Sequence, residues 1–353
     1  MRRAVGLMSG TSLDGIDVAM IETDGRAQVI PGAALTIPYQ TDFRGRLRSV
    51  LGGVGPVAEV ELELTRLHAE AVEHFLRQHP RQAIEIVGFH GHTILHRPAE
   101  RRTWQIGDGA VLARRLGLDV VADFRSADIA AGGEGAPLAP LFHAALAAPL
   151  PKPVVVLNIG GVANVTWIGE GDAILAFDTG PGNALIDDWV LRHTGASADI
   201  NGALARAGHV SAPHLEQLLK RPFFDRPPPK SLDRNEFRDL VPNELSLEDG
   251  AATLTEITAA TVQASARHFP HPARQWLVTG GGRHNPALMD ALRRRLATSV
   301  RPVEQIGWNG DALEAQAFAY LAVRSLEGLP LSLPSTTGVP RPTCGGRLFS
   351  SSG

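Results

Sequence analysis

Blocks of apolar residues alternate with polar turns along the first part of the chain. Residues 2–8 and 16–23 are apolar runs joined by a turn of small residues, which predicts a β-hairpin with a glycine-rich tip. Helical periodicity and buried-strand patterns then follow in turn, at residues 57–77, 83–89, 108–116 and 118–123. Strands that alternate with helices in this way indicate an α/β fold.

The opening order of elements recurs after residues 130–140, a segment rich in glycine, alanine and proline. A strand at 153–159, a glycine turn and two further strands are followed by a helix at 184–193. This recurrence predicts two similar domains that face each other across a deep cleft. We expect a first domain at residues 1–130, a second at 131–337, and a C-terminal segment at 338–353 that returns to the first.

The rest of the chain carries a few clear signals. Helical spacing predicts helices at 250–268 and 311–325, and the apolar run 275–282 predicts a strand that ends in three glycines. Asn285 precedes Pro286 and is expected to cap the following helix. The prolines and charges of residues 221–236 predict a surface excursion.

Composition narrows the class of protein. The chain has 353 residues and a net charge of −3, which argues against a non-specific nucleic-acid surface. A single cysteine, Cys344, excludes an intramolecular disulfide and a zinc site of several thiolates. No apolar run approaches the roughly 18 residues of a membrane span. We therefore expect a soluble, cytoplasmic protein with no nucleic-acid or membrane partner; a homodimer is left open.

Three glycine-rich turns end or join the predicted strands: SGTSLDG, DTGPGN and TGGGRHN. Glycine lets backbone N–H groups approach an anion closely, because no Cβ stands in the way. In the first turn Thr11 and Ser12 add hydroxyl donors, and Asp14 and Asp17 offer the hard oxygen ligands that suit Mg²⁺. Any one turn is explained as a tight connection, but three together favour phosphate.

The phosphate-binding pattern is not of the Walker type. That loop needs Gly-Lys followed by Ser or Thr, and the chain has only three lysines, Lys152, Lys220 and Lys230, none in such a motif. A triphosphate would then be held by backbone amides, hydroxyls and magnesium. The combination resembles the superfamily of sugar kinases, actin and heat-shock chaperone ATPases, and implies two actin-like, ribonuclease H-like domains.

Asp178 ends the apolar strand ILAFD, directly before TGPGN. A carboxylate in this position is well placed to act as a general base on an attacking nucleophile. The alternative is an aspartate that caps the next helix. We favour the base, because Asn183 is available as the cap.

Two further polar clusters follow predicted strands. Strand alternation places His90 and His92 on one side, where a metal pair is conceivable, although hydrogen bonding to a polar ligand or a turn role is favoured over zinc. In ADFRSAD, Arg125 is suited to clamp a carboxylate, while an internal pair with Asp123 is equally consistent with the spacing.

Long motifs across the whole chain resemble the anhydro-N-acetylmuramic acid kinase family. They are GLMSGTSLDGIDVA, FHGHTILHRP, TWQIGDGAVLA, VVADFRSADIAAGGEGAPLAPLFH, LNIGGVANVT, FDTGPGNALIDDW, PPPKS, GGGRHNPALM and EAQAFAYLA. The resemblance implies an ATP-dependent enzyme with Mg²⁺, which opens the anhydro ring of 1,6-anhydro-N-acetylmuramic acid with water and phosphorylates O6. The products would be N-acetylmuramic acid 6-phosphate and ADP, in recycling of cell-wall peptidoglycan.

The resemblance also implies roles for individual residues. It makes Asp178 the base. Nucleotide binding falls to Gly10, Thr11, Ser12, Leu13, Asp14, Gly15, Ile16, Asp17, Gly160, Gly180, Gly280, Gly281, Gly282 and Asn285. The sugar site falls to His90, Asp123, Arg125, Asn164 and Glu314.

The sequence departs from the family pattern at two positions. His92 stands where the family usually has Gln, and Asp233 follows PPPKSL where a Gly before an Arg is common. Two other functions stay open: a kinase or ATPase of the same fold that acts on another sugar, and a sensor that binds a cell-wall sugar without turnover. Retention of Asp178 and of the first glycine turn favours the enzyme.

Overall fold

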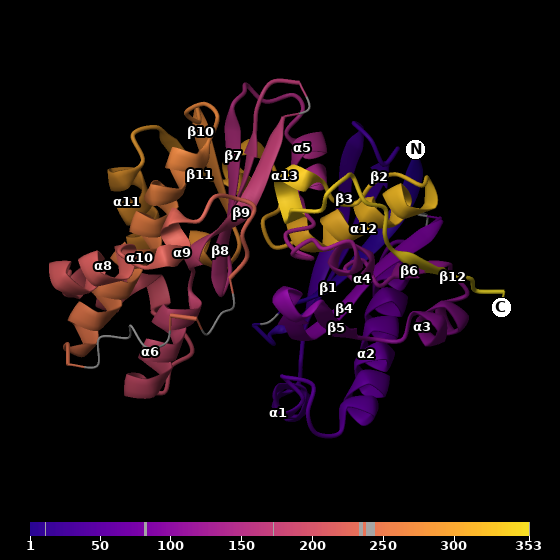
Figure 1. The fold of residues 1–353 in the computed structure, drawn as a ribbon. Coiled ribbons are helices and arrows are strands. Elements are labelled where there is room, and N and C mark those ends of the chain that lie inside the picture. Colours follow the sequence, from indigo (N-terminus) through magenta and orange to yellow (C-terminus); the bar gives the residue numbers. More distant parts are fainter. Residues whose placement is uncertain (11, 81–82, 172, 233–235, 238–243, 353) are drawn as a thin grey trace. The chain divides into compact units, whose positions relative to one another are not determined.

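The computed structural model describes residues 1–353 except residues 11, 81–82, 172, 233–235, 238–243 and 353. The chain divides into two units, one made of Met1–Pro149 with Ala312–Gly353 and the other of Leu150–Asp311 (Figure 1). These limits differ from the sequence-based boundaries at residues 130 and 337.

Unit 1 is built on a mixed sheet with the strand order β12-β6-β4-β1-β2-β3, and β5 pairs with β4. Its strands are β1 (Arg2–Ser9), β2 (Gly15–Thr23), β3 (Val29–Pro38), β4 (Ile86–Arg97), β5 (Arg102–Ile106), β6 (Val120–Ala122) and β12 (Arg347–Phe349). Its helices are α1 (Thr41–Ser49), α2 (Val57–Gln78), α3 (Gly109–Leu116), α4 (Ser126–Ala130), α5 (Pro140–Leu146), α12 (Leu313–Leu326) and α13 (Pro334–Thr337), with a 3₁₀ turn η1 (Pro98–Glu100).

Unit 2 has the strand order β11-β10-β7-β8-β9. The strands are β7 (Val154–Ile159), β8 (Val162–Ile168), β9 (Ile174–Pro181), β10 (Gln275–Thr279) and β11 (Ser299–Pro302). The helices are α6 (Ala184–Thr194), α7 (Ala203–Ala207), α8 (Ala212–Leu219), α9 (Pro222–Asp225), α10 (Leu247–Ser265) and α11 (Pro286–Arg295). Its 3₁₀ turns are η2 (Ile200–Gly202), η4 (Ala266–His268), η5 (Gly281–His284) and η6 (Val303–Ile306).

Both units repeat one strand order. In each, a three-stranded antiparallel meander comes first, β1-β2-β3 in unit 1 and β7-β8-β9 in unit 2. The first strand of each meander then pairs in parallel with a later strand, β4 or β10, which pairs in parallel with the next, β6 or β11. This 3-2-1-4-5 order is that of ribonuclease H-like domains and confirms the predicted α/β fold of two similar domains.

The predicted helix at 57–77 is confirmed as α2, which packs by one stripe against the unit 1 sheet. Its buried positions recur at three- and four-residue intervals, from Val60 and Leu64 through His68 to Val72 and Phe75. These side chains join the apolar face of β1, β2 and β4 in one core. The opening hairpin is also as predicted, with Met8 paired to Asp17 at its tip.

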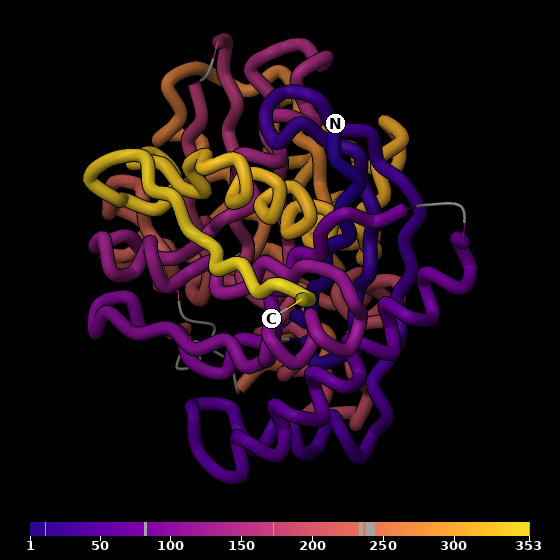
Figure 2. Tube along the Cα trace, turned by 90° about the vertical axis from the view of Figure 1, so that its right-hand side faces the viewer, coloured from indigo at the N-terminus to yellow at the C-terminus, as the bar shows by residue number. Residues whose placement is uncertain are grey.

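Helix α12 belongs to unit 1 because two glycines let its backbone lie directly on the sheet. A Cβ on Gly6 would lie 1.7 Å from the carbonyl oxygen of Ala315, and one on Gly88 would lie 2.1 Å from that of Phe318. After α12 the C-terminal strand β12 pairs antiparallel with β6, and Figure 2 shows this yellow segment returning beside the purple chain of the same unit. The sequence could not reveal these contacts, which explains the misplaced boundary at residue 337.

Two local expectations were wrong. The predicted strand at 83–89 continues through the HGHT motif, because β4 extends to Arg97 and pairs with β5. Residues 221–236 are not wholly a surface excursion: Phe223, Phe224 and Lys230 are buried. The aromatic rings in this segment, together with Phe237, pack into a core with α6 and α10, which outweighs the prolines and charges around them.

The α12 contact predicts the effect of a single methyl group. Gly6→Ala should lower the free energy of unfolding by about 3 kcal/mol, because its Cβ meets backbone that cannot yield. Gly45→Ala is the matched control in the same unit: nothing lies within 4 Å of its Cβ, and alanine in a helix should raise stability by about 1 kcal/mol. Urea unfolding of both variants measures the difference; equal stabilities would contradict this view of α12.

Candidate active site

A row of polar side chains crosses the unit 2 sheet near the carboxyl ends of β7, β9 and β10. The strand register pairs Thr279 with Asn158, Asn158 with Asn164, and Asn164 with Asp178. Residues in register point to the same face of a sheet. Two predicted site residues, Asn164 and Asp178, are therefore brought side by side. Asn158 and Thr279 were not predicted as site residues. The signal for Asn158 was its position as a polar residue inside the apolar run VVVLNI.

Asp178 is held by the segment that follows the PPPK motif. Its side chain is 9% exposed, and its backbone N–H donates to the carbonyl oxygen of Lys230 at 3.0 Å. One carboxylate oxygen, Oδ2, accepts a hydrogen bond from the N–H of Leu232 at 2.8 Å. This contact orients the carboxylate in a largely desolvated position, which suits a group that takes a proton.

The expected cap of helix α6 is not formed. Asn183 makes no side-chain capping bond, and its Nδ2 donates instead to the carbonyl oxygen of Ile159 at 3.3 Å. The reason given for preferring a base over a cap at Asp178 was therefore wrong. Asp178 lies within β9, six residues before α6 begins, and its contact with Leu232 replaces that reason.

The predicted glycines of unit 2 fall into two groups. Packing explains Gly180, Gly280 and Gly282, because a Cβ on each would lie 2.3–2.7 Å from Thr261, Asn158 or Ile159. At Gly160 and Gly281 the nearest atoms would be 3.7 Å and 3.5 Å away. Packing does not demand glycine there, and these positions are open to close approach by a ligand. Asn285 caps α11 as predicted, accepting from the N–H groups of Ala287 and Leu288.

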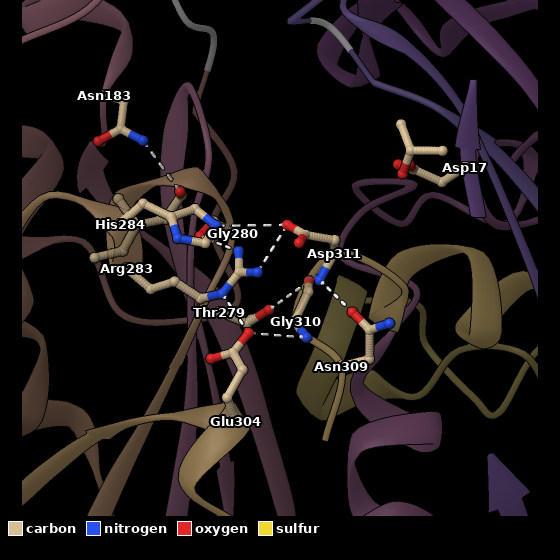
Figure 3. Close-up of polar contacts among 12 residues, drawn as sticks. Asp17, Asn183, Thr279, Gly280, Arg283, His284, Glu304, Asn309, Gly310 and Asp311 are labelled. Carbon is tan, nitrogen blue, oxygen red and sulfur yellow. Dashed lines mark hydrogen bonds and ion pairs between the residues drawn. The ribbon is translucent and has the colours of Figure 1, made fainter. Parts of the chain in front are cut away.

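A buried arginine organises the glycine turn after β10 (Figure 3). Arg283 is 7% exposed and donates to Glu304 and Asp311, both at 2.7 Å, and to the carbonyl oxygen of Gly280 at 2.9 Å. Burial works to raise the pKa of Asp311, but the hydrogen bond and charge of Arg283 hold it below its usual range.

These residues line a cavity of about 520 Å³ in unit 2. Its walls are Arg283, His284, Pro302, Glu304, Trp308, Asn309 and Asp311. Two further bonds fix its far wall: the N–H of Gly310 donates to Glu304 at 3.2 Å, and Thr279 donates to the carbonyl oxygen of Gly310 at 3.1 Å. The arginine in GGGRHN was the only sign of this cluster in the sequence motifs.

The glycine turn of unit 1 is short and internally bonded. Ser12 donates to the Asp14 carboxylate at 2.7 Å, and the N–H of Leu13 donates to the carbonyl oxygen of Gly10 at 3.1 Å. Leu13 adopts a positive φ of 60° and buries its side chain, which anchors the turn in the core. A Cβ on Gly10 would meet nothing nearer than Ser12 Oγ at 3.4 Å. Thr11, also predicted here, lies outside the described residues.

The remaining residues of this turn lead into β2. Gly15 is required by packing, because a Cβ would lie 2.4 Å from the carbonyl oxygen of Ile37. Ile16 is buried in the core, and Asp17 accepts a hydrogen bond from Thr36 Oγ1 at 2.6 Å. Among residues 15–17, only Asp17 has a polar side chain suited to bind a ligand.

His90 and His92 do not form a pair. Gly91 has a φ of 72°, and the pairing of β4 with β1 shifts between Phe89 and His92, which breaks the alternation of faces. His90 stacks on Phe318 of α12 at 4.5 Å. His92 instead bonds Ser9 Oγ at 2.9 Å. The prediction of two histidines on one side was therefore wrong.

His90 and Arg125, which the sequence assigns to a sugar site, are in contact with each other. Arg125 Nε donates to His90 Nε2 at 3.1 Å, and His90 Nδ1 donates to the carbonyl oxygen of Gly91 at 2.9 Å. Burial, helped by the Arg125 charge, lowers the pKa of His90 well below its usual value, so the ring is neutral. Arg125 also donates to the carbonyl oxygen of Gly135 at 2.7 Å.

The last two predicted site residues, Asp123 and Glu314, lie in different elements of unit 1. Asp123 has a positive φ of 54° and accepts from the N–H of Ser126 at 3.3 Å, so it shapes the turn into α4. Glu314 is exposed in the first turn of α12.

Comparison with known proteins identifies the family. A sequence profile of the family described as anhydro-N-acetylmuramic acid kinase matches residues 2–351. The chain belongs to this family. An anhydro-N-acetylmuramic acid kinase of Paramagnetospirillum magneticum (strain ATCC 700264 / AMB-1) is 58% identical, covering 98% of each chain. One of Acidiphilium cryptum (strain JF-5) is 56% identical, covering 98% of this chain and 97% of the relative.

Solved structures of distant proteins also align. A ROK family glucokinase from Streptomyces griseus, in complex with glucose and AMPPNP, covers 91% of this chain and 99% of its own, at 14% identity and a TM-score of 0.43. The fold follows from the strand order of the two sheets. Among the helices that lie in the described part of the chain, none combines the length and apolar character needed to cross a membrane.

The two groups of glycines predict opposite outcomes. Gly160→Ala should leave the free energy of unfolding nearly unchanged but weaken ATP binding at least about tenfold, because its methyl group would fill space that we expect the phosphates to occupy. Gly282→Ala should destabilise the fold, because its Cβ would lie 2.5 Å from Ile159. Thermal unfolding and calorimetric titration with ATP measure both effects. Normal ATP affinity in Gly160→Ala would remove this turn from the nucleotide site.

Proposed function

We propose that this chain uses ATP to convert 1,6-anhydro-N-acetylmuramic acid and water into N-acetylmuramic acid 6-phosphate and ADP, in recycling of cell-wall peptidoglycan. Family membership at up to 58% identity supports the substrate class. The observation that carries the mechanism is the buried carboxylate of Asp178, oriented by the N–H of Leu232.

Asp178 acts as the general base in this proposal. Water attacks the anomeric carbon as O6 departs from it, and the base takes the proton of the water, as in inverting glycoside hydrolysis. O6 attacks the γ-phosphorus, so the phosphoryl group captures the leaving oxygen and no separate acid is needed. Asn164, directly across the strand pair from Asp178, is placed to hydrogen-bond the sugar or the water.

Phosphoryl transfer depends mainly on positioning and charge neutralisation. We assign the phosphates to the turns around Gly10 and Gly160 and to Gly281, where the backbone leaves room for an anion. The cavity beside Arg283 and Trp308 is our assignment for the adenosine. Its neighbour His284, 64% exposed and 3.6 Å from Asp311, adds a polar ring to that wall.

The acidic side chains of unit 1 fit a magnesium ion. Asp14, Asp17 and the hydroxyl of Ser12 are hard oxygen donors close together in sequence, and Mg²⁺ prefers such ligands. Both carboxylates act on Tyr39, whose pKa is raised first by burial and further by their charges. Asp14 and Asp17 would hold the ion, directly or through water, and the bound ion would neutralise charge on the phosphates.

The sugar contacts fall to the polar residues of β4 and the following loops. Neutral His90 is aligned by its bonds to Arg125 and Gly91, and the Arg125 guanidinium supplies positive charge for the lactyl carboxylate. We assign Asp123 and Glu314 to the same substrate. Because the reaction consumes ATP, we assign the enzyme to the cytoplasm. The proposed chemistry requires no second copy of the chain.

Replacement of the proposed base distinguishes an effect on the chemical step from an effect on ATP binding. Asp178→Asn should lower kcat by about a thousandfold, because the amide cannot accept the water proton, while ATP binding stays within twofold. Release of ADP and calorimetric titration with ATP measure the two effects. A variant that retains a substantial rate would remove Asp178 from the role of base.

Isotopic labelling tests the whole reaction. In ¹⁸O water the product should carry one heavy oxygen at the anomeric carbon and a phosphate on O6. ADP release without added sugar would favour an ATPase, and sugar binding without phosphate transfer would favour a sensor. A phosphorylated product without heavy oxygen would contradict hydrolytic ring opening.

The metal assignment predicts a change in magnesium dependence. Asp14→Asn should raise the Mg²⁺ concentration for half-maximal rate about tenfold, because a charged oxygen ligand is lost. Asp42→Asn is the control: this carboxylate is 83% exposed and pairs only weakly with Arg46 across one helical turn. Rates measured across a magnesium series distinguish the two, and an identical response would exclude Asp14 from the metal site.

A further inference from the structure

Lys230 is a lysine that the fold buries. Only 3% of its surface is exposed, whereas lysine side chains are almost always solvated. Its ammonium donates to the carbonyl oxygens of Phe223 at 2.9 Å and Phe224 at 3.2 Å. It also lies over the ring of Phe223 at 4.7 Å and that of Phe177 at 5.8 Å.

The backbone of the same segment holds the proposed base at two points. The carbonyl oxygen of Lys230 accepts from the N–H of Asp178, and the N–H of Leu232 donates to the Asp178 carboxylate. Phe177, the residue before Asp178, lies under the Lys230 ammonium. The lysine side chain therefore connects both partners of Asp178 to the end of α9.

We infer that Lys230 is a positioning residue for Asp178: its buried ammonium anchors residues 230–232, and this segment fixes the direction of the carboxylate. The inference rests on the proposed function, in which Asp178 is the base. Loss of the anchor should leave the nucleotide turns intact, because the atoms nearest to an added Cβ at Gly160 and Gly281 belong to Val162 and Asn183 and not to this segment, and it should act on the chemical step alone.

Burial and nearby cations disfavour the charged form of this lysine. Burial first, and then the charges of Arg267 and Arg226, lower the pKa of Lys230 to about 8, while Asp225 works in the opposite direction. His268, the last residue of η4, faces the same ammonium and has its own pKa lowered by burial and by Lys230. Phe224 also accepts from Arg267. Positive groups thus surround the ammonium from α9 and from η4.

The direction of the Lys230 pKa shift determines how this residue affects stability at different pH values. The pKa of Lys230 in the folded chain lies below the ordinary value of 10.5, so the unfolded chain binds more protons between about pH 8 and 10.5. Burying the charged form therefore lowers the free energy of unfolding below pH 8, and that cost is relieved as the pH rises to 10.5. At neutral pH the chain keeps a buried charge that costs stability, which fits a role in positioning.

The kinetic test uses three lysine variants of the full chain with ATP, Mg²⁺ and the anhydro-sugar. Lys230→Met should lower kcat at least tenfold, with KM for ATP within twofold and thermal stability unchanged or raised. Lys230→Arg keeps a charged donor and should recover most of the rate. Lys220→Met is the control, because Lys220 is exposed at the end of α8. A normal kcat in Lys230→Met, or equal losses of rate and stability in both Lys230 variants, would overturn the inference.

Hydrogen exchange tests the anchor without using turnover. The amides of Asp178 and Leu232 donate the two bonds in question. Both amides should exchange at least tenfold faster in Lys230→Met than in the wild-type chain. In Lys220→Met their exchange rates should be unchanged. Unchanged exchange in Lys230→Met would refute the anchoring role. A wild-type chain with no turnover but normal protection at these amides would instead refute the proposed function.

Discussion

The register of the unit 2 meander is the constraint on which the proposed chemistry depends. Ladder hydrogen bonds between β8 and β9 place Asn164 opposite Asp178, through a shift of register after Ala163. A slip of one residue would turn every side chain of β9 to the other face, and Asp178 would exchange places with a core residue such as Phe177. The fully buried apolar positions of these strands prevent that slip. The core therefore fixes the direction of the carboxylate, and the segment that contains Leu232 refines it.

Glycine serves two different purposes in this chain, and the surrounding space tells them apart. Gly6, Gly88 and Gly282 let backbone or side chains approach more closely than any Cβ allows. Gly10 and Gly160 meet no such neighbour, so the fold tolerates a methyl group there. A glycine that packing does not require is better evidence for a ligand than one that packing explains. By this criterion, Gly15, Gly180, Gly280 and Gly282 are weaker evidence for a nucleotide than Gly10 and Gly160.

Periodicity was sufficient to predict the repeated order of elements along the chain, because buried strands and amphipathic α2 leave clear patterns. It failed where contacts over long sequence distances decide the outcome. Helix α12 joins unit 1 through Gly6 and Gly88, and nothing local in its sequence shows this. The bulge at Gly91 sends His90 and His92 to different neighbours, against simple alternation. The cluster around Arg283 depends on Glu304 and Asp311, which lie more than 20 residues away along the chain.

The repeated topology explains how one sheet design supports two kinds of chemistry. Asp17 is the third residue of β2, and Asn164 is the third residue of β8, so the two occupy equivalent positions. Their partners on the third strands are Thr36 and Asp178.

In unit 1 the acid therefore lies on the middle strand with a hydroxyl beside it, next to a turn that carries Asp14, and suits a metal ion. In unit 2 the order is reversed: the acid lies on the third strand, beside a neutral amide, and is covered by the Lys230 segment. A largely buried carboxylate next to an amide is suited to accept a proton, whereas two acids near a hydroxyl are suited to bind a cation. The same register in both units thus assigns the proposed metal ion to unit 1 and the proposed base to unit 2.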